Sequence, residues 1–155
     1  MKNKSFHLAQ FNIAEAKAPL DSPLLKGFVE RIDEINGLAD GEKGFVWRMQ
    51  DDSGNAMLIQ AYDNPDLLIN MSIWESVEDL KRFTYQTMHK ELIRDKKQWF
   101  HHIKAAYYVL WWIPEGHIPT LTEAKERLDL LREKGASPEA FNFKRSWTNS
   151  VVRKK

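Results

Sequence analysis

The fold is decided by the stretch Leu67-Leu68-Ile69-Asn70-Met71-Ser72-Ile73-Trp74, which Glu75-Ser76 follows directly. From Leu67 onward every second residue is apolar, which is typical of a β-strand with one face in a hydrophobic core. Ser76 is a preferred residue at the start of a helix, and Asp79 completes a weaker form of the capping box. The stretch therefore predicts a strand that leads directly into a helix.

Similar patterns occur on both sides of this unit. Further strands are expected at 6–13, 45–50 and 106–113, and 57–62 looks extended and could be the hairpin partner of 45–50. One helix is expected from Ser22-Pro23 to Ile35, and the helix after Ser76 reaches as far as His101 and His102. Thr120 and Glu123 form a capping box for a C-terminal helix, which Gly135 is expected to end.

The order of these elements is strand, helix, strand, strand, helix, strand, followed by one more helix. This is the βαββαβ order of a ferredoxin-like α+β sandwich, in which two helices cover one face of the sheet. The 155 residues fit a single domain, 1–155, of which 120–155 form a C-terminal helical extension. The other face of the sheet must then be solvated or covered by a partner.

Composition narrows the range of functions. Lys and Arg total 23 and Asp and Glu total 22, a balance that argues against a polybasic nucleic-acid-binding protein. The sequence contains no cysteine, which excludes disulfides, thiolate metal sites and a cysteine nucleophile, and no metal site is predicted. The longest apolar run, 105–113, is too short to cross a membrane, and no secretory leader is evident. We therefore expect a cytoplasmic protein that does not contact a membrane.

Alternation along the strands separates the two faces of the sheet. One face is apolar and is expected to pack on the helices; its members are Ala9, Phe11, Ile13, Phe45, Trp47, Met49, Leu67, Ile69, Met71 and Ile73. The other face collects Gln10, Asn12, Arg48, Asn70, Ser72 and Trp74. Apolar walls with a few converging polar groups are typical of ligand pockets, and a solvated face with one partly buried Trp is the alternative. The fourth strand is apolar on both sides, so the facing of Trp111 and Trp112 stays open.

The segment from Asn70 to Ser76, with His89 on the helix that follows, resembles the dimeric α+β barrel superfamily, which includes the antibiotic-biosynthesis monooxygenases. The whole chain resembles more closely a bacterial family known only as a domain of unknown function. The segments that carry this resemblance are His7–Asn12, Gly44–Arg48, Leu110–Pro114 and Gly116–Pro119. The superfamily resemblance implies a homodimer whose two sheets face each other and close a barrel. A second copy would also cover the half-polar sheet face.

The resemblance also implies roles for particular residues. In the cofactor-free monooxygenases of the superfamily, an Asn and a Trp four residues apart on one strand line the pocket, with an Arg nearby. Asn70 and Trp74 match that spacing, and Arg48 is a looser match by position. Haem-degrading relatives use a His on the second helix, for which His89 is the candidate, but they carry an earlier Trp on that helix that this chain lacks. No tightly bound organic cofactor is therefore expected, and haem is the alternative.

Each candidate also has a purely structural interpretation. Asn70 and Ser72 could bind a substrate carbonyl or phenol, or they could bond to each other or to cross-strand neighbours. Arg48 could hold an anionic group or pair with an acidic residue across the sheet, and Trp74 could stack on a planar ligand or pack at a dimer interface. His89 could be a base, a haem ligand or a structural residue. The further candidates for substrate contact are Gln10, Asn12, Trp111, Trp112 and His117.

Three functions follow from these residues. The leading hypothesis is a monooxygenase-like enzyme that acts on a small, planar, mostly apolar molecule by oxygenation or proton transfer. The second is a haem-binding or haem-degrading protein that uses His89. The third is a non-catalytic dimeric module that binds a small molecule, in which the tryptophans are core residues and Arg48 is paired.

Overall fold

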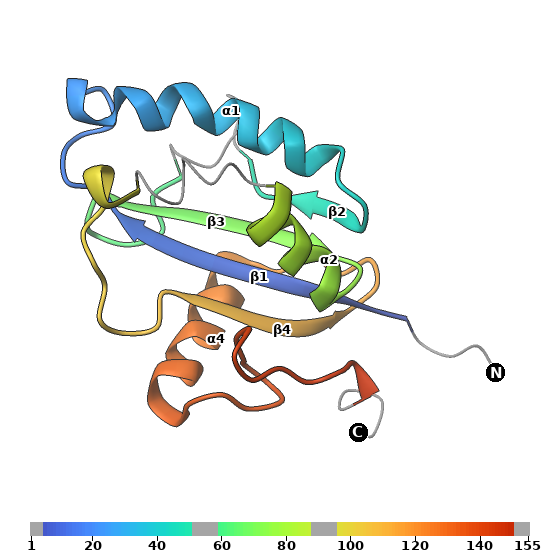
Figure 1. Cartoon of the computed structure of the whole chain (residues 1–155). Coiled ribbons are helices and arrows are strands. Elements are labelled where there is room, and N and C mark those ends of the chain that lie inside the picture. Colours follow the sequence, from blue (N-terminus) through green and yellow to red (C-terminus); the bar gives the residue numbers. More distant parts are fainter. Residues whose placement is uncertain (1–4, 51–58, 88–95, 151–155) are drawn as a thin grey trace.

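The computed structural model describes residues 5–50, 59–87 and 96–150. Its centre is a four-stranded antiparallel sheet in the order β2-β3-β1-β4 (Figure 1). The strands are β1 (Phe6–Glu15), β2 (Phe45–Arg48), β3 (Leu67–Trp74) and β4 (Tyr108–Pro114). The helical elements are η1 (Pro23–Leu25), α1 (Lys26–Asp40), α2 (Val77–Arg82), η2 (Phe83–Thr87) and α4 (Leu121–Lys134). This arrangement confirms the predicted mixed α+β, ferredoxin-like fold.

Local sequence signals place two of the helices where they were predicted. The Ser76 hydroxyl accepts a hydrogen bond from the Asp79 backbone N–H at the start of α2, at 3.1 Å. The Thr120 hydroxyl accepts one from the Glu123 backbone N–H at the start of α4, also at 3.1 Å. Ser22 behaves differently, because its hydroxyl donates to the Pro19 carbonyl and Pro23 begins a 3-10 turn. As a result α1 begins only at Lys26.

The middle of the chain departs from the predicted pattern. Residues 59–62 form no strand, so the hairpin expected at 57–62 is wrong there, and Met57 and Leu58 lie outside the described residues. The apolar side chains of this stretch pack against the sheet core instead of forming a strand beside β2. They belong to Ile59, Ala61 and Tyr62. The helix after Ser76 continues into the π-helical turn η2. A helical turn is again present at 96–99, and His101 and His102 are exposed beyond it.

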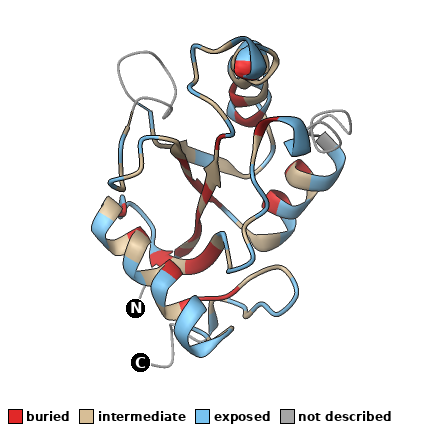
Figure 2. Ribbon diagram, turned by 90° about the vertical axis from the view of Figure 1, so that its left-hand side faces the viewer, coloured by how far each residue is buried: buried red, intermediate tan, exposed pale blue. Residues whose placement is uncertain are grey.

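Helices of the same chain cover both faces of the sheet. The apolar face packs on α4, through Ala124, Leu128 and Leu131. The mixed face packs on α1 and α2, through Ala39 and Leu80. The prediction that the apolar face carries the two helices of the βαββαβ unit is therefore wrong, because the C-terminal helix takes that place. Composition alone cannot distinguish these arrangements, since any amphipathic helix buries an apolar face equally well. Buried residues occur along the strands and also on the helices that cover them (Figure 2).

Strand register shows on which face of the sheet each tryptophan of β4 lies, and it corrects the predicted face of one residue in β2. On β4, Trp111 pairs with Ala9 of the apolar face, whereas Trp112 pairs with Leu8 of the mixed face. In β2 a bulge between Phe45 and Trp47 interrupts the alternation, so that Phe45 pairs with Trp74. Phe45 therefore lies on the mixed face, and its predicted grouping with Trp47 is wrong.

The sequence argument for a homodimer assumed that one sheet face has no cover within the chain. In a single chain, however, Leu8 and Leu110 on the mixed face and Met71 and Trp111 on the apolar face are all fully buried. The assumption therefore does not hold, and the homodimer stays a prediction. None of the helices in the described ranges is long and apolar enough to cross a membrane.

Candidate functional site

The polar residues of the mixed face form two neighbouring rows across the middle of the sheet. Strand register places Asn70, Asn12 and Tyr108 opposite one another on β3, β1 and β4. The next row runs through Arg48, Ser72 and Gln10 on β2, β3 and β1, and ends at Leu110 on β4. We call the six polar members of these rows the polar band: Gln10, Asn12, Arg48, Asn70, Ser72 and Tyr108.

An apolar row borders the polar band at one end. It contains Phe45, Trp74, Leu8 and Trp112, which register places side by side on the four strands. The Trp74 ring is only 1% exposed and lies edge-on to Phe45, with centroids 5.5 Å apart. Phe83 of η2 contacts the same indole at 5.2 Å. Trp74 thus forms an apolar wall whose packing partners belong to its own chain.

Hydrogen bonds join the members of the polar band to one another. Gln10 Nε2 donates to Asn70 Oδ1 at 2.6 Å and to Ser72 Oγ at 3.0 Å. Asn12 Nδ2 donates to Gln10 Oε1 at 2.8 Å and more weakly to Asn70 Oδ1 at 3.4 Å. The Trp74 indole N–H, which can only donate, reaches Ser72 Oγ at 2.9 Å. These bonds hold the amide groups in defined orientations before any ligand binds.

The internal bonds leave part of the hydrogen-bonding capacity unused within the described residues. Asn70 takes part through Oδ1 alone, so both donors of its Nδ2 group remain. Ser72 accepts two bonds and keeps its hydroxyl proton, and Asn12 keeps Oδ1 as an acceptor. Asn12 and Asn70 are half-buried, whereas Gln10 and Ser72 in the neighbouring row are buried. The groups that a bound molecule can reach most readily are therefore those of the Asn12 and Asn70 amides.

Arg48 is held by an acidic residue of the first helix. Its Nε lies 2.8 Å from Asp40 Oδ1, and its second guanidinium nitrogen lies 3.3 Å from Asp40 Oδ2. This two-point contact to a carboxylate neutralises the guanidinium charge. An ion pair was the structural alternative for Arg48, and the partner lies on α1 rather than across the sheet.

Tyr108 is the member of the band that sequence reasoning missed. Its hydroxyl oxygen accepts a hydrogen bond from the Phe143 backbone N–H at 3.1 Å, and the two rings lie 5.5 Å apart. Burial raises the pKa of the phenol above its usual value, so the hydroxyl is uncharged near neutral pH. The fourth strand is apolar on both sides, which hid the facing of Tyr108. The sequence offered one signal for its role, because Tyr108 begins this strand and carries a polar hydroxyl group among apolar residues.

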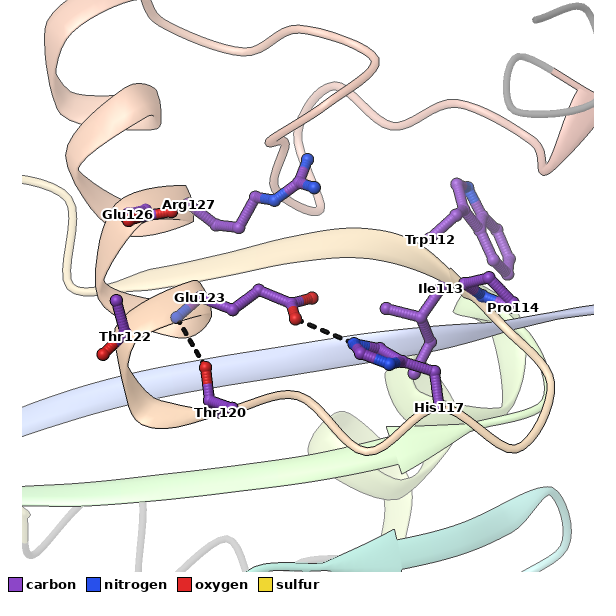
Figure 3. Close-up of a pocket in the computed structure, with 9 residues that line it drawn as sticks. All are labelled: Trp112, Ile113, Pro114, His117, Thr120, Thr122, Glu123, Glu126 and Arg127. Carbon is purple, nitrogen blue, oxygen red and sulfur yellow. Dashed lines mark hydrogen bonds and ion pairs between the residues drawn. The ribbon is translucent and has the colours of Figure 1, made fainter.

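Two of the other predicted contact residues lie on the far side of the sheet, around α4. Trp111 Nε1 donates to Glu123 Oε2 at 3.0 Å, and His117 Nε2 lies 2.8 Å from Glu123 Oε1. These contacts tie the turn before α4 to the helix. Trp112 belongs to the mixed face, and its Nε1 donates to the Trp147 carbonyl at 2.8 Å. His117 and Trp112 help to line an open depression of about 500 Å³ beside Glu123 and Arg127 (Figure 3).

The haem hypothesis depends on a residue that the structure does not describe. His89 lies within 88–95, so haem binding through it stays a prediction. In the ranges 5–50, 59–87 and 96–150, no group of three or more His, Asp or Glu side chains is arranged to hold a metal ion.

Comparison with known proteins places the chain in a family. No curated protein matches it. Similar solved structures include a protein of unknown function from Nitrosomonas europaea (10% identity, TM-score 0.48, covering 76% of this chain and 97% of that chain) and a protein from Pseudomonas aeruginosa (12%, 0.46, 76% and 100%). A third, from Chloroflexus aurantiacus J-10-fl, is described as an antibiotic biosynthesis monooxygenase (14%, 0.39, 74% and 98%). At these identities the likeness concerns the fold alone. A family model matches residues 7–155, which confirms the resemblance seen in the sequence: the chain belongs to the family described as "Domain of unknown function (DUF3291)".

Proposed function

We propose that the chain binds a small, planar, mostly apolar molecule against the polar band, and that Asn70 holds an oxygen atom of this ligand. The observation that carries the proposal is the Nδ2 group of Asn70, which has no partner in the part of the chain that the structure describes and whose orientation is fixed by bonds to Oδ1. A donor held in place in this way loses little freedom when it binds a ligand. The half-buried setting also strengthens the hydrogen bond relative to one in water.

The surroundings of Asn70 favour an apolar ligand body. Leu110 lies within the second row of the band, and Leu8 and Trp74 follow in the next row. All three are buried apolar side chains on the face that carries Asn70, so they make the surroundings of its amide apolar while they pack within the chain. Apolar walls with a small number of fixed polar groups are the usual composition of small-molecule sites.

The enzymatic form of this proposal assigns a role to the same amide. The Asn70 donors stabilise negative charge on a substrate oxygen as a proton leaves the substrate. Arg48 does not supply this stabilisation, because Asp40 already neutralises its charge. His89 is the predicted proton acceptor. The resemblance to cofactor-free monooxygenases supports reaction of the resulting carbanion or phenolate with dissolved O2 as the following step, in which one oxygen atom enters the substrate as a carbonyl and the other leaves as water.

The binding proposal is tested with planar bicyclic compounds that differ in polarity. Chromone offers a carbonyl acceptor, 1-naphthol a hydroxyl, 1-naphthoate a carboxylate, and naphthalene no hydrogen-bonding group. Asn70→Asp keeps an oxygen for Gln10 and Asn12 to donate to, but it replaces the Nδ2 donors with a second oxygen. Isothermal titration or ligand-observed NMR is expected to show that chromone binds the wild type more tightly than naphthalene does. Chromone should bind Asn70→Asp at least about tenfold more weakly.

Asn149→Asp is the matched control, since it makes the same change at a position outside the polar band. It should bind chromone as the wild type does. If none of the four compounds binds, or if Asn70→Asp binds chromone as tightly as Asn149→Asp does, the proposal is wrong.

Turnover separates an enzyme from a binding module. With 1-naphthol as the probe, an oxygen electrode records whether dissolved oxygen is consumed. Consumption by the wild type that falls in Asn70→Asp but not in Asn149→Asp supports the monooxygenase-like enzyme. Binding of 1-naphthol without any oxygen consumption or product supports the non-catalytic module instead.

A further inference from the structure

We infer that Tyr108 is a second ligand-binding donor of the polar band, and that Asn70 and Tyr108 together select a ligand with an uncharged oxygen acceptor. This inference rests on the proposed binding site and adds a residue and a ligand class to it. Three observations support it. Tyr108 lies in the same row of the sheet as Asn70, its hydroxyl group is protonated, and most of the hydrogen-bonding groups that remain in the polar band are donors.

The position comes from strand register. Asn12 pairs with Asn70 on one side and with Tyr108 on the other, so the three residues form one row on one face. Neighbouring strands are about 4.8 Å apart, which places the backbones of Asn70 and Tyr108 about 10 Å apart. This separation is comparable to the length of a planar bicyclic molecule.

The Tyr108 hydroxyl is arranged to donate. Its oxygen already accepts the Phe143 backbone N–H, and its own proton has no acceptor among the described residues. Among the described residues, Tyr85 and Tyr107 are the titratable groups that shift the pKa of Tyr108 by their charge, and both raise it. The group therefore stays a neutral phenol, with one O–H left for a ligand.

The unused groups of the polar band are mostly donors. Within ranges 5–50, 59–87 and 96–150, Asn70 Nδ2, the Ser72 hydroxyl and the Tyr108 hydroxyl are left to donate, whereas Asn12 Oδ1 is left to accept. The Arg48 charge is balanced by Asp40, so the band carries no net charge. A carboxylate bound there would lose its hydration without gaining an opposite charge, whereas a ketone or ester carbonyl accepts the same donors at a lower cost.

An aromatic wall beside Tyr108 comes from a π-helical turn. In η2, Phe83 contacts Trp74, and Tyr85 lies 5.8 Å from the ring of Phe143, which in turn contacts Tyr108. The π-helical turn thus brings one ring against Trp74, beside the polar band, and another against Phe143, which contacts Tyr108. Such turns are frequent at functional sites, and these rings suit the flat body of the ligand.

The test compares Tyr108→Phe with Tyr107→Phe, which removes the same hydroxyl from the exposed neighbouring residue. Tyr108→Phe is expected to bind chromone about tenfold more weakly than the wild type does and to bind naphthalene unchanged. Tyr107→Phe should match the wild type for both compounds. Chromone and naphthalene are similar in size, so the ratio of their affinities isolates the lost hydrogen bond from any general loosening of the packing.

The outcomes distinguish this inference from the proposal beneath it. If Asn70→Asp weakens chromone binding but Tyr108→Phe does not change the ratio, the site stands and the role of Tyr108 is wrong. If 1-naphthoate binds the wild type as tightly as chromone does, the selection of an uncharged acceptor is wrong. If no compound binds, or if Asn70→Asp has no effect, the proposed site and the role of Tyr108 fall together.

Discussion

At the scale of single residues, burial changes the acidity of two tyrosines. Desolvation raises the pKa of Tyr62, and nearby Asp129 raises it further. Desolvation also raises the pKa of Tyr108, and the hydrogen bond from the Phe143 backbone opposes this only in part. A raised pKa means that the folded protein holds the phenol proton more tightly than the unfolded chain does. The resulting stability is complete below the usual tyrosine pKa of about 10 and is lost as the pH rises above it.

We therefore expect the free energy of unfolding to fall above about pH 10 because these two phenols lose their protons on unfolding. Urea denaturation at a series of pH values measures the effect. The double variant Tyr62→Phe/Tyr108→Phe should show a shallower alkaline fall than the wild type does. Tyr107→Phe, at an exposed site, should follow the wild-type curve. Parallel falls in the wild type and the double variant would contradict the assigned cause.

The side chains that meet in the polar band were predictable where alternation holds. β1 and β3 pair in continuous register, so spacing by two residues was enough to bring together Gln10, Asn12, Asn70 and Ser72. Tyr108 was not predictable in this way, because a strand with apolar residues on both sides gives no parity. Contacts made through side-chain ends, such as Arg48 with Asp40, depend on helix placement that no local pattern encodes.

At the scale of elements, the entry to β2 depends on one glycine. Gly44 has a φ of +85°, and its carbonyl accepts the Glu75 backbone N–H at 2.7 Å, which ties the entry to β2 to the end of β3. A side chain at this position would meet the buried carboxylate of Asp79 in α2. Gly135 at the end of α4 also has a positive φ, of +74°, but it has open space around it.

This difference predicts the effect of alanine at the two glycines. Gly135→Ala is expected to cost about 1–2 kcal/mol, because alanine disfavours a positive φ. Gly44→Ala should cost about 1–3 kcal/mol more, because Asp79 must also move out of its buried position. Chemical denaturation of the two variants measures both losses. Equal losses would show that the contact between Gly44 and Asp79 does not constrain the fold.

The element order was predictable from caps and periodicity, but the way the layers assemble was not. The β2 bulge occurs within Phe45-Val46-Trp47, a stretch in which no glycine marks the break in alternation. Each face of the sheet can be covered by any amphipathic helix that reaches it, so the sequence did not show which helix covers which face. α4 carries its own apolar stripe and buries the face that α1 and α2 were expected to cover.

At the scale of the whole molecule, one chain buries both faces of its sheet. The residues at the centre of the apolar face, Phe11, Met71 and Trp111, have no exposed surface even without a second copy. They pack with Ala124, Leu128 and Leu131 of α4, so this face is covered within the chain. The half-polar face, on which the sequence argument placed a second copy, packs on α1 and α2 through Ala39 and Leu80.

The free energy of unfolding should therefore be independent of protein concentration. When a second copy completes a hydrophobic core, folding is linked to association and the unfolding midpoint rises with concentration. We expect the urea midpoint of this chain to be the same at about 1 µM and about 100 µM, because its core is closed within one copy. Sedimentation velocity over the same range gives the molecular mass directly. A midpoint that rises with concentration, together with a dimer mass, would show that the second copy belongs to the folded unit and would support the homodimer predicted from the sequence.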